Sequence, residues 1–188
     1  MSILSDFTFG EIESVLEQNP SLRGFVQGYL AEIALMKYLK HIPGVSNVYK
    51  IPDRDLQKGD IHISYNGLSL TIEVKSVSSR GIREDTMHES WDGLVGCKNS
   101  DRRVALLENG IEFNTSNIIR GTFDILAIST YAVNEKWDFL YMENRFLPGL
   151  ETSNSLIKTA FRINPNNTPL VESNIIKVLD SAIEHKLK

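Results

Sequence analysis

The sequence predicts a mixed α/β domain in which a central sheet is flanked by helices. Three observations point to this class: helical patterns open the chain, a hairpin follows around Asn66-Gly67, and residues 171–186 form a closing amphipathic helix. The 188 residues are 41% hydrophobic and 23% charged, which is ordinary for a globular protein with a sizeable core. We therefore expect a single domain over residues 1–188.

The first two expected helices are separated by Asn19-Pro20. Thr8 and Glu11 have the spacing of a capping box, so the first helix is predicted to begin there. Proline disfavours helical geometry in the residue before it, which ends that helix at Asn19. The second helix is expected over residues 22–40, with an apolar stripe made of Leu22, Val26, Tyr29, Leu30, Ile33 and Met36.

The hairpin is the sharpest local prediction. Asn66-Gly67 suits a type I′ loop, because both central residues of that turn need positive φ. The resulting register pairs Ile61 with Ile72 and separates two faces. One face carries Ile61, Ile63, Tyr65, Leu68, Leu70 and Ile72, and the other carries Asp60, His62, Ser64, Ser69, Thr71 and Glu73. This clean separation argues that the register is right.

The remaining strands are expected at residues 45–51, 94–97, 104–107, 123–129 and 137–142. The stretch FDILAIS, residues 123–129, is nearly continuous in apolar residues, which is typical of a central strand covered on both faces. Residues 76–122 form the least regular part and are interpreted as an insertion. The pattern of residues 155–163 does not distinguish helix from strand.

The open end of the hairpin gathers charged residues. Asp60 is expected opposite Glu73 with Cβ atoms about 5 Å apart, which is destabilising for like charges. A divalent cation would turn this repulsion into ligation, because Mg²⁺ is held by carboxylates together with phosphate oxygens. Lys75 points to the same face, where it could hold a nucleophilic water or stabilise charge on a phosphate. Solvated strand ends are the alternative, but the facing aspartate and the clean register favour a site.

Glu32 in the second helix is a candidate third carboxylate. It has no oppositely charged residue three or four positions away, so the usual helical ion pair is absent. Gly28, one turn earlier, costs helix stability and leaves room for another element to approach. A solvated glutamate on the flank of the apolar stripe is an equally good interpretation.

The charge distribution bears on the partner. The formal net charge is −4, whereas nucleic-acid binders are more often basic. Two basic runs nevertheless follow the hairpin: KSVSSRGIR, which contains Arg80 and Arg83, and KNSDRR, which begins at Lys98. Such runs are usually solvated surface or exposed turns. Their position directly after the charged hairpin end favours contacts with phosphate.

Several classes of protein are excluded or disfavoured. No apolar run approaches the ~20 residues of a membrane span. The N-terminal segment is acidic where a signal peptide is basic, so we expect a cytoplasmic protein without a membrane partner. Cys97 is the only cysteine, which excludes an internal disulfide and a cysteine-based zinc cluster.

Gly59-Asp60, Glu73-Val74-Lys75 and the earlier Glu32 resemble the motif of the PD-(D/E)XK nuclease superfamily, which has the restriction-endonuclease-like fold. The resemblance spans roughly residues 22–142 in topology but few positions in motif. It implies a metal-dependent endonuclease that uses Mg²⁺, or Mn²⁺ in its place. Asp60, Glu73 and the Val74 carbonyl would be metal ligands. Lys75 would position the attacking water, and Glu32 would be an accessory acid.

One departure from the family pattern concerns the residue before Asp60. It is Gly59, where the name of the family implies proline. A literal Pro52-Asp53 occurs earlier, in the polar stretch PDRDLQKG before the hairpin begins. The register favours Asp60, and Asp53 and Asp55 are interpreted as turn formers.

The segment WDGLVGCKNSDRRVALLENG followed by FDILAIS looks like what small type II restriction endonucleases carry after their active site. The similarity implies double-stranded DNA as substrate, and a homodimer suits the cutting of both strands of a symmetric site. The residues implied to contact DNA are Lys98, Asn99, Ser100, Arg102 and Arg103, with Arg80 and Arg83 added from the neighbouring basic run. The alternatives are a repair or junction-resolving nuclease, a catalytically inert DNA-binding or scaffold module, and a hydrolase of small phosphoesters.

Overall fold

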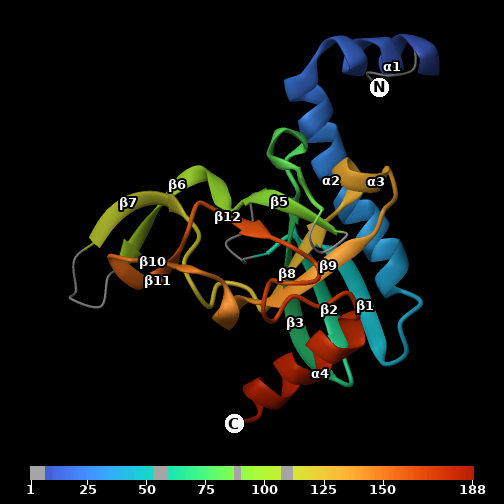
Figure 1. Cartoon of the computed structure of the whole chain (residues 1–188). Coiled ribbons are helices and arrows are strands. Elements are labelled where there is room, and N and C mark those ends of the chain that lie inside the picture. The colour runs from blue at the N-terminus through green and yellow to red at the C-terminus, as the bar shows by residue number, and fades with distance from the viewer. Residues whose placement is uncertain (1–6, 53–58, 87–89, 107–111) are drawn as a thin grey trace.

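A five-stranded sheet forms the centre of the computed structural model, which describes residues 7–52, 59–86, 90–106 and 112–188 (Figure 1). The strand order is β1-β2-β3-β8-β9. These strands are β1 Val45–Lys50, β2 Ile61–Tyr65, β3 Leu68–Ser76, β8 Ile125–Ser129 and β9 Phe139–Glu143. β3 and β8 are parallel, and the other neighbours are antiparallel. The predicted mixed α/β class, with helices flanking a mixed sheet, is confirmed.

Two helices cover the apolar face of the sheet. α2 (Pro20–Leu39) and α4 (Ile175–Lys186) pack against the side chains that the hairpin register predicted to be apolar. Ile61 pairs with Ile72 as expected, and both are fully buried. Burying a side chain of this size stabilises the fold by roughly 1.5–3 kcal/mol. The register between Ile61 and Ile72 is therefore confirmed and held by the core.

A second, smaller β layer covers part of the opposite face. It is a three-stranded sheet of β12 (Ala160–Ile163), β5 (Ser90–Gly96) and β4 (Arg83–Asp85). Its Val95 and Phe161 share a core with Leu126 of β8 and Met142 of β9. β8 is buried along its whole length, as its apolar sequence predicted. On the β2–β3 half of the same face, Ser69 is exposed and its polar neighbours are only half-buried.

The predicted boundary between the first two helices is confirmed. α1 runs from Phe9 to Gln18 and has the expected capping box: the Thr8 hydroxyl accepts from the Glu11 backbone, and the Glu11 carboxylate accepts from the Thr8 backbone. α2 begins at Pro20, directly after Asn19. No residue of α1 is buried.

The apolar stripe predicted for α2 is wrong except at Met36, which packs against the core. Leu22, Leu30 and Ile33 are 42–43% exposed, whereas the buried face consists of Ala31, Leu35 and Leu39. Figure 1 shows the reason: α1 and the N-terminal half of α2 extend beyond the sheet, so only the C-terminal half of α2 packs on it. An exposed apolar face therefore remains on the projecting half.

Residues 76–122, expected to be the least regular part, contain four strands. β4 and β5 belong to the second layer, and a 3₁₀ turn, Ser79–Gly81, precedes them. β6 (Lys98–Leu106) and β7 (Glu112–Asn117) form a hairpin that extends away from the central sheet (Figure 1). The sequence KNSDRRVAL lacks a period-2 apolar pattern, so periodicity missed most of β6. Leu107, the last residue of the strand expected there, lies outside the described residues.

The C-terminal third refines the remaining predictions. Residues 155–163 fall in two strands, β11 (Ser153–Ile157) and β12, and β11 pairs with β10 (Gly149–Leu150). α3 is Tyr131–Asn134 and a second 3₁₀ turn is Asn144–Phe146. α4 begins at Ile175, later than the predicted start at residue 171. Glu172 still forms an antiparallel bridge with Tyr141 of β9, so the chain is extended there, and Asn174 caps the helix. No helix in the described ranges is long and apolar enough to cross a membrane.

Candidate active site

The backbone at Gly59 sets how Asp60 enters the sheet. Gly59 has φ of 93°, in the left-handed region. A Cβ added there would lie 3.2 Å from the Ile72 carbonyl oxygen. Proline cannot occupy the position, because its ring fixes φ near −65°. The departure from a Pro-Asp motif therefore has a conformational cause.

Asp60 is held by the next strand, although not in the regular pairing that the register predicted. The β2–β3 ladder ends at Ile61–Ile72, and the N–H of Asp60 donates to the Ile72 carbonyl at 2.8 Å. The Asp60 carboxylate then accepts a hydrogen bond from the N–H of Val74, with Oδ2 at 2.7 Å. The side chain is thereby turned toward the Glu73-Val74-Lys75 segment.

Asp60 and Glu73 interact through their charges. Burial, followed by the Glu73 carboxylate, raises the pKa of Asp60 to about 7 from its ordinary value of 3.8. Lys75 and the Val74 N–H act in the opposite direction, and Glu32 adds a smaller upward contribution. Like charges near each other disfavour ionisation. The site therefore favours an additional positive charge beside Asp60 at neutral pH.

Lys75 supplies part of that charge. Its Nζ donates to Oε1 of Glu73 at 2.6 Å, and only 9% of Glu73 is exposed. Burial by itself lowers the pKa of Lys75, but the Glu73 and Asp60 carboxylates outweigh it, so the pKa is raised overall. Lys75 is therefore an ammonium at neutral pH. It can donate to a water or to a phosphate oxygen, but it cannot act as a general base.

Glu32 approaches the same cluster from α2. Its charge contributes to the raised pKa of Asp60, so the helix does bring a third carboxylate toward the hairpin end. Glu32 pairs with Lys50 of β1, and the Lys50 Nζ also lies 4.7 Å from the centre of the Tyr29 ring. No local pattern marks this pair, because the residues are 18 positions apart and belong to different elements.

The donor set suits a hard cation. The Val74 N–H points toward the Asp60 carboxylate, and the Glu73 carboxylate, from the residue before Val74, acts on Asp60 through its charge. The N–H and C=O of one strand residue point to the same side, so the Val74 carbonyl is directed there as well. Carboxylate and carbonyl oxygens are the ligands of Mg²⁺, which keeps several waters. Within the described ranges, no three His, Cys, Asp or Glu side chains gather closely enough to hold a metal, so main-chain oxygen and water would complete the coordination.

The basic residues expected to contact DNA lie in the 3₁₀ turn Ser79–Gly81, on β4 and on β6. Arg80, Arg83 and Lys98 are exposed. Asn99, Ser100, Arg102 and Arg103 lie on β6, and their side chains are outside the described part of the structure. Asp53 and Asp55, interpreted as turn formers, also lie outside the described residues.

Cys97 joins β5 to β6 directly beside the charged cluster. It is fully buried, and burial raises the pKa of its thiol to about 12, with Lys75 lowering it and Glu73 raising it further. A protonated, inaccessible thiol is not a nucleophile. The charges of Lys75 and Glu73 act on Cys97, so the start of β6 at Lys98 is close to the candidate site.

Comparison with known proteins adds one structural likeness. No protein-family model and no curated protein matches the chain. Among solved structures, a bacterial homing endonuclease is similar, with a match probability of 1.00 and a TM-score of 0.48. The two share 17% sequence identity over 85% of this chain and 96% of that chain. A likeness at this level is too weak to support a conclusion about activity.

Proposed function

We propose that the protein is a metal-dependent endonuclease of the restriction-endonuclease-like fold that hydrolyses phosphodiester bonds in double-stranded DNA. One observation carries the proposal: the half-buried carboxylate of Asp60 and the buried carboxylate of Glu73 lie with the Lys75 ammonium at the end of an accessible polar sheet face. Two carboxylates and a cation at one hairpin end destabilise the metal-free fold. They suit the hydrolysis of a phosphodiester.

Asp60, Glu73 and the Val74 carbonyl would hold Mg²⁺, or Mn²⁺ in its place, and the bound ion would supply Lewis acidity at the scissile phosphate. Lys75 donates to the attacking water and orients its oxygen toward phosphorus. As the new P–O bond forms, the attacking water releases one proton to the surrounding solvent. The bond to the leaving ester oxygen breaks, and that oxygen takes up a proton from solvent. The Lys75 ammonium stabilises the negative charge that develops on the phosphate oxygens.

The β6–β7 hairpin suits the recognition of duplex DNA. A two-stranded β-ribbon fits the major groove, and arginine side chains can pair with guanine edges or with phosphates. Lys98, Asn99, Ser100, Arg102 and Arg103 would contact DNA from β6, next to the candidate site. Arg80 would contact the DNA backbone from the 3₁₀ turn before β4, and Arg83 would do so from β4. This arrangement favours a restriction-type enzyme over a hydrolase of small phosphoesters.

A homodimer accounts for the projecting helices. Phe9 is 79% exposed and Phe25 is 70% exposed, and both lie on the part of α1 and α2 that extends beyond the sheet. A ten-residue helix such as α1 is marginal in water without tertiary contacts. A second copy would cover this apolar face and would bring two sites to the two DNA strands.

Cleavage of long duplex DNA with Mg²⁺ or Mn²⁺ tests the proposal. Wild type is compared with Lys75→Ala and with the matched control Lys136→Ala, which removes an exposed lysine after α3. We expect discrete fragments from wild type and from the control, and none from Lys75→Ala. A smear from wild type that is lost in Lys75→Ala would favour a nuclease of the repair or junction-resolving kind over a restriction-type enzyme. An absence of cleavage, together with an absence of metal binding, would favour an inert DNA-binding module.

A further inference from the structure

A groove of about 650 Å³ opens where β8 begins, beside the end of β9 and the last turn of α4. Among the described residues that line it are three cationic side chains, those of Arg120, Arg145 and Lys186, together with His185. Asp124 is the single carboxylate in this lining. The formal net charge of the chain is −4, so the groove is a local concentration of positive charge on an acidic protein.

Arg120 is a fixed cation of the groove wall. Its Nε donates to the Asn154 carbonyl at 2.8 Å, and its Nη1 and Nη2 donate to the carbonyls of Asn144, Arg145 and Leu147. These acceptors are neutral, so they hold the guanidinium in place without cancelling its charge. Arg145, by contrast, is paired with Glu143. A preorganised cation of this kind attracts an anion at low entropic cost.

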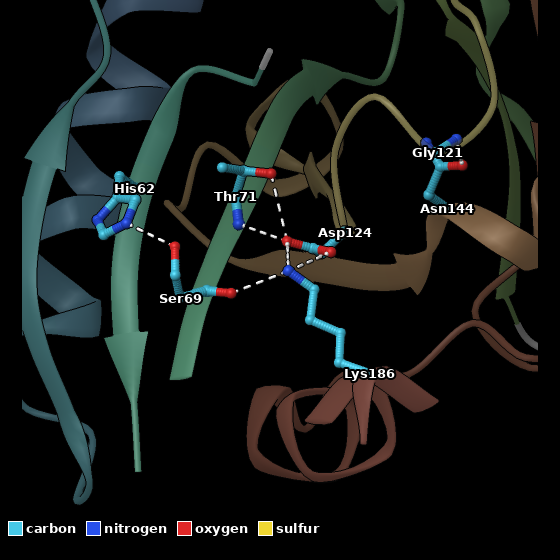
Figure 2. Close-up of polar contacts among 7 residues, drawn as sticks. All are labelled: His62, Ser69, Thr71, Gly121, Asp124, Asn144 and Lys186. Carbon is cyan, nitrogen blue, oxygen red and sulfur yellow. Dashed lines mark hydrogen bonds and ion pairs between the residues drawn. The ribbon is translucent and has the colours of Figure 1, made fainter. Parts of the chain in front are cut away.

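Lys186 reaches the sheet from α4, as Figure 2 shows. Its Nζ lies 2.9 Å from Oδ1 of Asp124 and donates to the Ser69 carbonyl, also at 2.9 Å. The Asp124 carboxylate accepts from the N–H of Thr71 at 2.7 Å as well. The Lys186 side chain is 40% exposed, so its ammonium is accessible while it remains paired.

The groove continues the polar face that leads to the candidate active site. Thr71 lies two residues before Glu73 on β3, and their side chains share a face, which puts them about 7 Å apart along the strand. On the neighbouring strand, His62 is hydrogen-bonded to the hydroxyl of Ser69 (Figure 2). The Thr71 hydroxyl donates to Oδ2 of Asp124 at 3.3 Å, so the groove adjoins the polar face two residues before Glu73.

Asn144 gives a second, independent indication of a ligand. Its Oδ1 accepts from the N–H of Gly121 at 2.7 Å, and only 3% of the residue is exposed. Its Nδ2, at the groove wall, has no hydrogen-bond partner within the described part of the chain. Buried donors are nearly always satisfied, often through a bridging water. A bound anion would supply an acceptor for such a water.

We propose that this groove binds a backbone phosphate of the cleaved DNA strand, one that neighbours the scissile phosphate. Lys186 exchanges its contact with Asp124 for the phosphate, and Arg120 adds its fixed charge. The inference rests on the proposed function, because it assigns the path of the substrate strand relative to Asp60 and Glu73. It adds backbone contacts at the start of β8, beside Asp124, to those proposed for β6.

Binding of a duplex oligonucleotide of about 30 base pairs, followed by fluorescence anisotropy over a range of salt concentrations, tests the groove. All proteins carry Lys75→Ala and are measured with Mg²⁺, so that binding is read without cleavage. Adding Lys186→Ala removes one phosphate contact. We expect binding about fivefold weaker near 0.15 M salt, with a salt slope smaller by about 1. The matched control Lys177→Ala removes a lysine from the same helix, one that pairs with Glu172 outside the groove.

Asp124→Asn distinguishes a phosphate contact from a purely structural ion pair. The asparagine still accepts from the Thr71 N–H but no longer competes for Lys186, so we expect DNA to bind more tightly. A purely structural pair would make Asp124→Asn and Lys186→Ala change binding in the same direction. Melting temperatures of all variants, measured alongside, verify that each protein is folded.

The outcomes separate this inference from the function beneath it. If Lys186→Ala matches Lys177→Ala in affinity and in salt slope, the groove is not a phosphate site, and the nuclease proposal stands. If the Lys75→Ala protein binds no duplex DNA at any salt concentration, the nuclease proposal itself is contradicted, and the groove assignment is lost with it.

Discussion

The ammonium of Lys75 lies 2.6 Å from a carboxylate oxygen of Glu73, two residues earlier on the same strand. Alternation along a strand places the two side chains on one face, so the contact follows directly from the sequence spacing. Both groups are largely buried, at 22% and 12% side-chain exposure. A buried ion pair costs desolvation that its attraction only partly offsets. With Asp60 beside it, the cluster is a strained arrangement of charge within a well-packed fold.

Removing the carboxylate of Asp60 should stabilise the metal-free protein while abolishing cleavage. Asp60→Asn keeps an acceptor for the Val74 N–H and removes the repulsion with Glu73. Near pH 8 we expect a gain on the order of 2 kcal/mol, or roughly 4–8 °C in Tm. Thermal unfolding in chelator, followed by cleavage assays with Mg²⁺, measures both effects. A lower Tm for this variant would contradict the repulsion inferred here.

The stability of the metal-free protein should fall as pH rises from about 4 to about 7. The pKa of Asp60 is raised from 3.8 in the unfolded chain to about 7 in the folded protein, so the folded state binds the proton more tightly. This contribution is fully present below the unfolded pKa and is lost as pH rises through the folded one, at about 1 kcal/mol per pH unit. Denaturant unfolding at several pH values measures it, and Asp60→Asn should flatten the profile over this range.

Metal affinity should rise across the same pH range. Asp60 must lose its proton to act as a ligand, so Mg²⁺ or Mn²⁺ binding releases a proton below pH 7. Isothermal titration calorimetry in two buffers of different ionisation enthalpy counts the protons released. We expect close to one proton near pH 6 and almost none near pH 8.5. Equal affinity at both pH values would rule out Asp60 as a ligand.

Glu32 should affect catalysis more than metal binding. Its pairing with Lys50 and its charge near Asp60 give it an outer position in the cluster. We expect Glu32→Ala to bind Mn²⁺ and to cleave DNA 10–100-fold more slowly, as is typical of outer-shell partners. Glu13→Ala, which removes an exposed glutamate of α1, is the control. Complete loss of metal binding in Glu32→Ala would make Glu32 a direct ligand instead.

The proposed dimer predicts that a charge on α2 separates the two copies. Phe25→Glu places a carboxylate at the centre of the exposed apolar face, so light scattering should report the mass of one 21.2 kDa chain. Val104→Glu, which changes an apolar residue that is 60% exposed on β6, should leave the dimer intact. A wild-type protein that is already monomeric at working concentration, with DNA present, would remove the dimer from the proposal.

The hairpin could be predicted in detail because two independent signals agreed. Asn66-Gly67 defined the loop, and the alternation of apolar and polar residues defined the faces, so the Ile61–Ile72 register followed. The same register predicts that Asp60, Glu73 and Lys75 gather at one end of the hairpin. It did not anticipate that the ladder stops at Ile61–Ile72, because no local pattern marks the positive φ of Gly59 or the hydrogen bond from the Asp60 N–H to the Ile72 carbonyl.

Other features depend on contacts that a single sequence does not reveal. The buried face of α2 is set by where the sheet ends along the helix, so helical periodicity selected the exposed face instead. Lys50 meets Glu32 across two elements, and Lys186 meets Asp124 across 62 positions. Nothing local marks Arg120, whose four carbonyl acceptors come from residues 144–154. These contacts are properties of the folded chain.

The parallel pairing of β3 with β8 has an evolutionary consequence. Parallel neighbours need a crossover from one end of the sheet to the other, and here that crossover contains β4 to β7. The chain leaves the sheet after Ser76 and re-enters it at Ile125, and both points are fixed by core packing on either side. Insertions and substitutions in the β6–β7 hairpin, which extends away from the central sheet, can therefore accumulate without displacing Glu73 or Lys75. Under the proposed function, the residues that read DNA can change while the charged end of the β2–β3 hairpin keeps its geometry.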